Sequence, residues 1–468
     1  MEKNKIFLVL LIAIGTFLLV YTPHYNYPFP SHADEWHHIT ETIRLETGGY
    51  SGKSIGLRLG FHILLLPLSK VVNLVLIYKF LPAIWAVLCV LVVFFTVYRK
   101  TKKDFFTAAM AMFFFASIKS NVNITGLWFF TPLTFSIPFI FLYIYFFTEG
   151  LERENKKLVL LSLLIMAFLL PIHAISVLFA FPFLIIHSLF NFRYIKKEGK
   201  LFSLFFIIPL MGVVFYKFMM QLPWQDLINN MVQALQFKRG WGKLEINNSP
   251  SELYSLIGYI LLIPGVASIL KNRDNFKKYL VYLLWPVCVL LSIFIFRSSG
   301  VSYLVPYQRN LYYFAISLPL LSAIGASCLF KGISRFSKKA AYIFITIIII
   351  SAFWSYWRIP DQIALYEAID DNDYRALLFL SSLTQASVVM APAGTSEALY
   401  PVARKNPVAT YAFYGNRKDS ENFFNSDDCK IKEEILGKYG VRYVLTKSKI
   451  NCGWKLIYDK GDYIYEAK

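Results

Sequence analysis

The sequence predicts an all-α polytopic transmembrane fold that is followed by a small α/β domain. Of its 468 residues, 56% are hydrophobic and only 16% are charged, and the mean hydropathy is +0.49. Apolar runs that approach the roughly 20 residues needed to cross a bilayer recur along the chain. After Pro360 the composition becomes that of an ordinary soluble protein.

The net charge of +19 would suit a nucleic-acid-binding protein, but the distribution of the charges does not. Lys and Arg gather in short clusters between apolar runs, which is typical of topology control in a membrane, with lipid headgroups as secondary partners. We therefore expect no nucleic-acid partner. The clusters are Arg99–Lys103, Arg153–Lys157, Arg193–Lys200, Lys271–Lys278 and Lys331–Lys339.

If these clusters are cytoplasmic, two crossings separate each neighbouring pair, and about 11 transmembrane helices result. The N-terminus is then cytoplasmic, and the C-terminal domain lies outside the cell membrane. The expected spans are Ile6–Tyr21, Lys79–Tyr98, Phe105–Lys119, Trp128–Phe147, Leu158–Leu170, His173–Phe190, Leu201–Met220, Leu253–Leu270, Leu280–Phe296, Asn310–Phe330 and Ala340–Trp357.

The run Leu57–Leu76 leaves the topology of the first loop open. It carries Arg58, His62, Pro67 and Lys70, so we expect juxtamembrane helices that lie in the interface. The loop 22–56 is then outside. If the run spans instead, there are about twelve crossings and Asp34 is cytoplasmic. Lys3 and Lys5 before the first span favour the first arrangement.

We expect two domains, a transmembrane domain 1–358 and an extracytoplasmic α/β domain 359–468. Turn residues and apolar periodicity in the second predict helices over Tyr374–Leu383 and Ile431–Tyr439, strands over Ala386–Ala391 and Val441–Thr446, and a hairpin of Trp454–Tyr458 with Tyr463–Glu466. Cys429 and Cys452 also lie here, and both a disulfide and two free thiols are compatible with their positions.

An acidic pair, Asp34 and Glu35, follows the first span within the loop 22–56. Carboxylates are costly near hydrocarbon, so a pair held at a bilayer surface indicates a functional site. A purely structural alternative is that Asp34 caps a helix over 35–46, because anions favour that end of a helix.

An acidic pair in the first outer loop, interfacial helices after it, many spans and a soluble C-terminal domain together resemble the GT-C superfamily of membrane glycosyltransferases. The Asp34-Glu35 pair is similar to the Asp-Glu motif of the protein O-mannosyltransferase and aminoarabinose-transferase branch. The resemblance implies a GT-C-like fold and an inverting transferase that moves a monosaccharide from a polyprenyl-phosphate donor to a protein, lipid or lipid-linked glycan outside the cytoplasm.

The chemistry of such a transfer fits one acidic pair. The acceptor hydroxyl needs a base as it attacks the anomeric carbon. Phosphate is already a good leaving group, so the second carboxylic acid of a glycoside hydrolase is not required. The resemblance assigns the catalytic base to Asp34, with Glu35 in support.

A cation must hold the donor phosphate, and Arg309 in Val305-Pro-Tyr-Gln-Arg309 is the first candidate. Its guanidinium can grip a phosphate with two hydrogen bonds. A snorkelling interfacial Arg is the structural alternative. His173, at the expected outer junction of two spans, and Arg239 are further donor-phosphate candidates.

The acceptor or the sugar is expected to contact His37, His38, Trp241 and Tyr307. Histidines crowd the acidic pair, but they lack metal-ligand spacing, so we predict no cofactor, with a divalent metal as an alternative. The loop Ser120–Thr125 has no acidic residue, and the tail lacks a Trp-Trp-Asp-Tyr-Gly signature. Both absences argue against en bloc transfer of an oligosaccharide.

The competing class is a transporter or flippase of a lipid-linked glycan. Such proteins place charges near the bilayer midplane and contain inverted repeats. The expected spans are nearly free of charge, and the sequence shows no internal repeat. A non-catalytic membrane scaffold is the third possibility.

Overall fold

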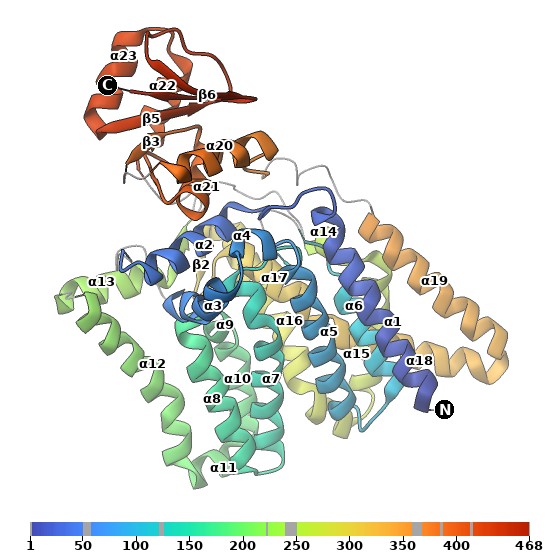
Figure 1. Cartoon of the computed structure of the whole chain (residues 1–468). Coiled ribbons are helices and arrows are strands. Elements are labelled where there is room, and N and C mark those ends of the chain that lie inside the picture. The colour runs from blue at the N-terminus through green and yellow to red at the C-terminus, as the bar shows by residue number, and fades with distance from the viewer. Residues whose placement is uncertain are drawn as a thin grey trace. The chain divides into compact units, whose positions relative to one another are not determined.

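The computed structural model describes residues 2–49, 58–120, 126–220, 223–238, 250–357, 367–383, 387–411 and 415–467 (Figure 1). The chain forms two compact units. We call Met1–Thr22, Ile55–Phe61 and Pro82–Pro360 the bundle unit, and Pro23–Ser54, His62–Leu81 and Asp361–Lys468 the sheet unit.

The bundle unit is almost entirely helical. Its long helices are α1 (Glu2–Tyr21), α5 (Leu81–Lys100), α6 (Phe105–Ala116), α7 (Pro132–Glu152), α8 (Lys156–His173), α10 (Phe181–Phe190), α12 (Gly199–Met220), α13 (Trp224–Ala234), α15 (Leu256–Leu270), α16 (Arg273–Ser299), α17 (Tyr307–Ser317), α18 (Pro319–Phe336) and α19 (Lys338–Trp357). Short elements between them are α9 (Ile175–Leu178), α11 (Phe192–Lys197), α14 (Pro250–Leu253) and the antiparallel pair β1 (Gln236–Lys238) and β2 (Val301–Tyr303).

Within the described part of the chain, six helical segments are long and apolar enough to cross a membrane. They are Lys3–His24, Leu81–Lys100, Pro132–Glu152, Lys156–His173, Arg273–Ser299 and Tyr307–Phe336. Five shorter apolar helices accompany them: Leu59–Val71, Phe105–Ala116, Ile175–Phe190, Gly199–Phe215 and Leu256–Leu270. The chain is a membrane protein, and the count of eleven crossings stays a prediction.

Each expected span coincides with a helix or with a helix pair. The pairs arise where the sequence breaks a hydrogen-bond ladder. Pro319 has no N–H to donate and begins α18 directly after α17, so one expected span is two helices in the structure. The run Leu57–Leu76 is likewise divided into α3 (Leu59–Val71) and α4 (Leu74–Ile77), because Asn73 caps α4 through the Val75 N–H at 3.0 Å.

The sheet unit contains a five-stranded mixed sheet in the order β4-β3-β5-β7-β6. Its strands are β3 (Val388–Met390), β4 (Asn406–Pro407), β5 (Val441–Thr446), β6 (Lys455–Lys460) and β7 (Asp462–Glu466). Its helices are α2 (Ala33–Glu46), α4, α20 (Asp371–Ser382), α21 (Ala393–Ala398), α22 (Arg417–Asn425) and α23 (Cys429–Tyr439). A π-helical turn covers Leu399–Ala403.

Helices connect the parallel strands of the sheet and share an apolar core with it. β3 and β5 are parallel, so a crossover must join them, and α22 and α23 lie in that connection. Phe423 of α22 and Leu436 of α23 share an apolar core with Met390, Val444 and Tyr465 of the sheet. The hairpin, β5 and α23 occur where the sequence predicts them. The α22 and α21 helices were not predicted.

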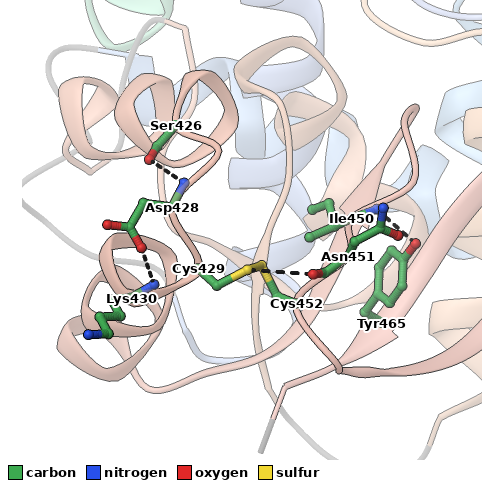
Figure 2. The surroundings of a disulfide bond; sticks show 8 residues. All are labelled: Ser426, Asp428, Cys429, Lys430, Ile450, Asn451, Cys452 and Tyr465. Carbon is green, nitrogen blue, oxygen red and sulfur yellow. Dashed lines mark hydrogen bonds between the residues drawn. A yellow bond between two sulfur atoms is a disulfide. The ribbon is translucent and has the colours of Figure 1, made fainter.

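A disulfide joins Cys429, the first residue of α23, to Cys452 in the segment before β6 (Figure 2). Both flanks are hydrogen-bonded: Asp428 caps α23 by accepting from the Lys430 N–H at 2.8 Å, and the Ile450 N–H donates to the Tyr465 hydroxyl at 3.0 Å. Of the two alternatives left open by the sequence, the structure has the disulfide.

The first loop belongs to the same compact unit as the C-terminal segment. Tyr27 donates its hydroxyl proton to the Ile369 carbonyl at 3.0 Å, and the Phe29 ring lies 4.9 Å from that of Tyr374. These contacts link residues more than three hundred positions apart in the chain. The domain boundary that we expect from the sequence, at residue 358, divides the chain into two continuous segments. The compact units are not continuous in the chain, because the sheet unit combines the loop that carries the acidic pair with the C-terminal sheet.

Candidate active site

The acidic pair lies in the first turn of α2, and its two carboxylates have different tasks. His32 is the N-cap, and its Nδ1 accepts the Asp34 N–H at 3.0 Å. The Glu35 carboxylate reaches back to accept from the N–H groups of Ser31 at 3.0 Å and His32 at 3.2 Å. The alternative in which Asp34 caps this helix is therefore wrong, because His32 and Glu35 do so.

Burial separates the two carboxylates further. The Glu35 side chain is completely buried, whereas 21% of the Asp34 side chain is exposed. Asp34 Oδ2 lies 4.0 Å from His32 Nδ1, but that nitrogen uses its lone pair to accept the Asp34 N–H and so carries no proton there. The pair thus consists of one structural carboxylate and one that reaches solvent.

Three histidines, His37 and His38 of α2 and His62 of α3, lie close together. His38 Nδ1 and His62 Nε2 are 2.9 Å apart, so the N–H of one ring donates a hydrogen bond to the nitrogen of the other. The His37 ring centroid lies 5.4 Å from that of His38. His37 and His38, the predicted acceptor-binding residues, are both buried. Their packing joins α2 to α3 and fixes the orientation of the helix that bears Asp34.

The far end of α2 is also anchored. The Arg44 guanidinium lies 3.3 Å from the buried Glu41 carboxylate and 4.8 Å from the centroid of the Tyr400 ring. The Tyr400 hydroxyl in turn is 3.2 Å from Thr47 Oγ1. Both ends of α2 are therefore fixed within the sheet unit, which holds Asp34 at a defined place.

In the bundle unit, Arg309 is the third residue of α17. Asn310 fixes the start of this helix, because its amide donates to Ser292 Oγ at 2.9 Å and Ser302 Oγ at 3.1 Å. The preceding turn places Leu304 at φ +66°, a left-handed conformation that is costly for a branched side chain. A helix start combined with an Arg side chain is a favourable arrangement for an anion.

His173, at the end of α8, belongs to the same neighbourhood. Its Nδ1 is 2.7 Å from Ser176 Oγ, which is 2.9 Å from the Tyr313 hydroxyl on α17. The charges of Arg309 and Arg58 both act on the His173 ring. We refer to Arg58 and Arg309, whose charges both act on His173, as the cation cluster.

Arg58 is the residue of this cluster that sequence reasoning missed, since it was assigned to an interfacial helix. Its charge acts on the His173 ring, and Gly60, two residues later, lets the start of α3 approach α8. A Cβ at Gly60 would lie 3.0 Å from the carbonyl carbon and oxygen of Pro171. The available signal was an arginine within an apolar run, a residue that is expensive there unless it is used.

Of the three remaining candidates, one is engaged in other contacts and two lie outside the described residues. The Tyr307 ring stacks on Phe296 at 4.4 Å, and its hydroxyl accepts a hydrogen bond from Arg297 Nε at 2.9 Å. Tyr307 is buried. Arg239 and Trp241 lie outside the described residues.

Metal-ligand geometry does not occur around Asp34 among the described residues. The one group of His, Cys, Asp or Glu in the described ranges that is close enough to share an ion is Asp370, Asp373 and Asp462 in the sheet unit.

The apolar helix bundle, together with a loop-borne acidic pair and a C-terminal sheet, defines a membrane protein of the GT-C fold. Crystal structures of the Archaeoglobus fulgidus oligosaccharyltransferase share this fold. The apo form gives a TM-score of 0.60 at 13% identity, over 95% of this chain and 69% of that one. The complex with Zn and sulfate gives 0.59 at 14% identity, over 94% and 68%.

A third structure, the oligosaccharyltransferase AglB from the same organism with an inhibitory peptide and a dolichol-phosphate, gives a TM-score of 0.57 at 14% identity, over 95% of this chain and 69% of that one. At this identity the likeness establishes the fold alone. No protein-family model and no curated protein matches the sequence. The O-mannosyltransferase and aminoarabinose-transferase branch stays a prediction.

Proposed function

We propose that this chain is an inverting membrane glycosyltransferase that moves a monosaccharide from a polyprenyl-phosphate donor to an acceptor outside the cytoplasm. The observation that carries the proposal is the division of labour in the acidic pair. The Glu35 carboxylate accepts the capping hydrogen bonds of α2. Asp34 is the partly exposed carboxylate of the pair, on a helix that is fixed at both ends. A rigidly held carboxylate of this kind suits a general base.

In the proposed reaction, the acceptor hydroxyl oxygen attacks the anomeric carbon of the donor sugar. The hydroxyl proton passes to the Asp34 carboxylate, and the bond between the anomeric carbon and the phosphate oxygen breaks. The electron pair of that bond leaves with the polyprenyl phosphate. Glu35 is a positioning residue, because its carboxylate acts on the backbone around Asp34.

The cation cluster is the proposed site of the donor phosphate. Arg58 and Arg309 can each form paired hydrogen bonds to phosphate oxygens, and their charge favours the phosphate as it departs. Arg309 also lies in the first turn of α17, the end of a helix that favours an anion. The dolichol-phosphate bound in an AglB structure of the same fold is the chemistry that this arrangement suits.

A second candidate is transfer of a whole oligosaccharide, which the fold of the A. fulgidus oligosaccharyltransferase favours. The sequence argues for a single sugar, because Ser120–Thr125 has no acidic residue and the Trp-Trp-Asp-Tyr-Gly signature is missing. The Cys429–Cys452 disulfide supports the proposed extracytoplasmic position of the sheet unit, since disulfides persist in oxidising compartments.

The test is an assay of the purified full chain with a panel of polyprenyl-phosphate monosaccharides and oligosaccharides, in which donor binding and sugar transfer are measured separately. Asp34→Asn should bind donor normally and fail in transfer. Arg309→Ala should lose donor affinity first, and Arg309→Lys should recover only part of it, because the planar fork is lost.

Arg297→Ala is a matched control, since Arg297 is bonded to Tyr307 and should change donor affinity less. Transfer by Asp34→Asn at the wild-type rate would place the base elsewhere. If no lipid-phosphate sugar binds, or if vesicles containing the protein translocate a lipid-linked glycan, the transporter alternative replaces this proposal.

A further inference from the structure

A second polar centre in the sheet unit lies apart from the acidic pair along the chain. Asp370 and Asp373 belong to the start of α20, and Asp462 is the first residue of β7, directly after the turn at Gly461. One carboxylate oxygen from each of the three lies within 4.8 Å of the others. Asp373 and Asp462 are almost completely buried, with relative exposures of 1% and 3%.

The positive charge that this centre contains is smaller than its negative charge. Lys447 places Nζ 2.9 Å from Asp370 Oδ2 and 2.9 Å from Asp373 Oδ2. One ammonium therefore faces three carboxylates. Buried ionised carboxylates without a counter-charge are strongly unfavourable, so the centre must take up a further positive charge, either a proton or a metal cation.

Two of the carboxylates already have partners other than Lys447. Asp370 Oδ1 caps α20 by accepting from Asn372 and Asp373 N–H groups, each at 2.9 Å. Asp373 Oδ2 accepts the Asp370 N–H at 2.9 Å, and its Oδ1 accepts the Thr395 hydroxyl at 3.2 Å. By contrast, Asp462 Oδ2 is buried and accepts no hydrogen bond from the described residues. This oxygen needs a ligand.

The atoms around the centre are oxygens of the kind that hard cations prefer. Besides the three carboxylates there is the Thr395 hydroxyl. Neither sulfur nor imidazole is among these groups. Such a set suits Ca²⁺ or Mg²⁺ rather than zinc.

We propose that Asp370, Asp373 and Asp462 form a binding site for a divalent hard cation, with Ca²⁺ as the better match to a flexible all-oxygen set. The cation binds Asp462 Oδ2 and shares Asp370 and Asp373, while the half-exposed Lys447 moves outward. The site joins the start of α20 to the β6–β7 hairpin.

A cation at this site would affect the first loop, because residues next to the site contact that loop. Ile369, the residue before Asp370, accepts the Tyr27 hydroxyl, and Tyr374 packs on Phe29. The segment that contains Tyr27 and Phe29 leads directly to His32 and Asp34. A cation that fixes the start of α20 therefore stabilises the packing of this segment against the C-terminal part of the sheet unit.

A proton is the competitor of the cation. Burial, together with the neighbouring charge of Asp373, raises the pKa of Asp462 to about 7. Asp370 and Asp373 add negative charge around this carboxyl, and Lys447 adds positive charge. A proton on Asp462 and a cation at the site therefore compete for the same carboxylate oxygens.

The experiment uses the purified full chain after treatment with a chelator, and it measures Ca²⁺ and Mg²⁺ binding by calorimetry and thermal unfolding at pH 6 and pH 8. We expect one Ca²⁺ to bind at pH 8 and raise the unfolding temperature. Asp462→Asn should weaken Ca²⁺ binding about 10-fold or more, because a charged ligand is lost. Asp459→Asn, on the same hairpin but half-exposed, is the matched control and should bind as wild type does.

Two further variants make the result independent of any folding defect in Asp462→Asn. Lys447→Met should bind Ca²⁺ more tightly than wild type, since the competing ammonium is removed. Asp34→Asn should keep the Ca²⁺ effect, which distinguishes this site from the acidic pair. Equal Ca²⁺ binding by wild type and Asp462→Asn would overturn the proposal. So would the absence of Ca²⁺ and Mg²⁺ binding, which would mean that Asp373 and Asp462 share a proton.

Discussion

In the bundle unit, buried carboxylates are held by cations, whereas in the sheet unit Glu35 is held by backbone N–H groups. Lys100 Nζ lies 2.9 Å from Glu149 Oε1 and 2.7 Å from Glu152 Oε2, and Arg153 adds a contact of 2.6 Å to Glu149. Glu35 instead completes a capping box and leaves its neighbour Asp34 partly exposed. A cation beside a carboxylate favours its charged form and makes it a weaker base, so the two units stabilise their structural carboxylates in different ways.

The largest expected effect comes from removing the shared cation of the bundle unit. Lys100 is almost completely buried, so Lys100→Met leaves the buried Glu149 with less counter-charge in a dry environment and removes the partner of the partly exposed Glu152. Breaking a buried pair in this way costs about 3–5 kcal/mol of unfolding free energy. Unfolding in detergent measures it.

Lys156→Met is the control for this variant. Lys156 pairs with Glu198 at 2.8 Å, but its side chain is 66% exposed, so its loss should leave the stability unchanged. Equal stability of the two variants would mean that the Lys100 network does not stabilise the bundle unit.

The next effect should be confined to the sheet unit. The Cys429–Cys452 bond closes a loop of 23 residues, which corresponds to about 3 kcal/mol in a chain-entropy model. Reductant, or the double change of both residues to Ser, should lower the unfolding free energy of the sheet unit by that amount. Its unfolding temperature should fall accordingly. Cys328→Ser, at an exposed free thiol, is the control. An equal response of both variants would contradict a stabilising disulfide.

Local sequence signals predicted the elements of both units well. Apolar runs placed the helices of the bundle, and Gly440 ends α23 with φ +60°, as a glycine after a helix should. The alternation of side-chain types over Tyr463–Glu466 predicted the strand β7. These elements follow from nearest-neighbour chemistry, which the sequence displays directly.

The association of the first loop with the C-terminal segment could not be predicted in this way. It depends on contacts such as Tyr27 with Ile369 and Phe29 with Tyr374, which periodicity does not encode. The same is true of the electrostatic effect of Arg58 on His173, since the approach of α3 to α8 at Gly60 and Pro171 is a long-range packing contact. The role of Glu35 as a cap was hidden because His32, an uncommon N-cap residue, takes the place of Ser, Thr, Asp or Asn.

A third prediction tests the two halves of the acidic pair against each other. Asp34→Asn removes the proton acceptor but no cap, so transfer should fall about 100-fold or more with little change in stability. Glu35→Gln keeps one acceptor oxygen but loses the charge, so it should cost about 1 kcal/mol of stability and reduce transfer much less. Transfer rates and unfolding curves of both variants separate the roles. The reverse pattern would make Glu35 the base.

The smallest expected effect concerns the approach of α3 to α8 in the bundle unit. A Cβ at Gly60 would meet the backbone carbonyl of Pro171 at 3.0 Å, and that group cannot rotate away as a side chain would. Gly60→Ala should therefore move the start of α3 by a few tenths of an ångström and displace Arg58 from the cation cluster. We expect donor affinity to fall about 5–10-fold, which corresponds to about 1 kcal/mol.

Gly212→Ala is the matched control for this variant, because Gly212 is also within a helix and nothing lies within 4 Å of its Cβ position. It should leave donor binding unchanged and increase helix stability by up to about 1 kcal/mol. Donor binding to both variants can be compared by titration with the same polyprenyl-phosphate sugar. If Gly60→Ala binds donor as well as Gly212→Ala does, Arg58 makes no contribution to the phosphate site, and Arg309 with His173 must hold the donor without it.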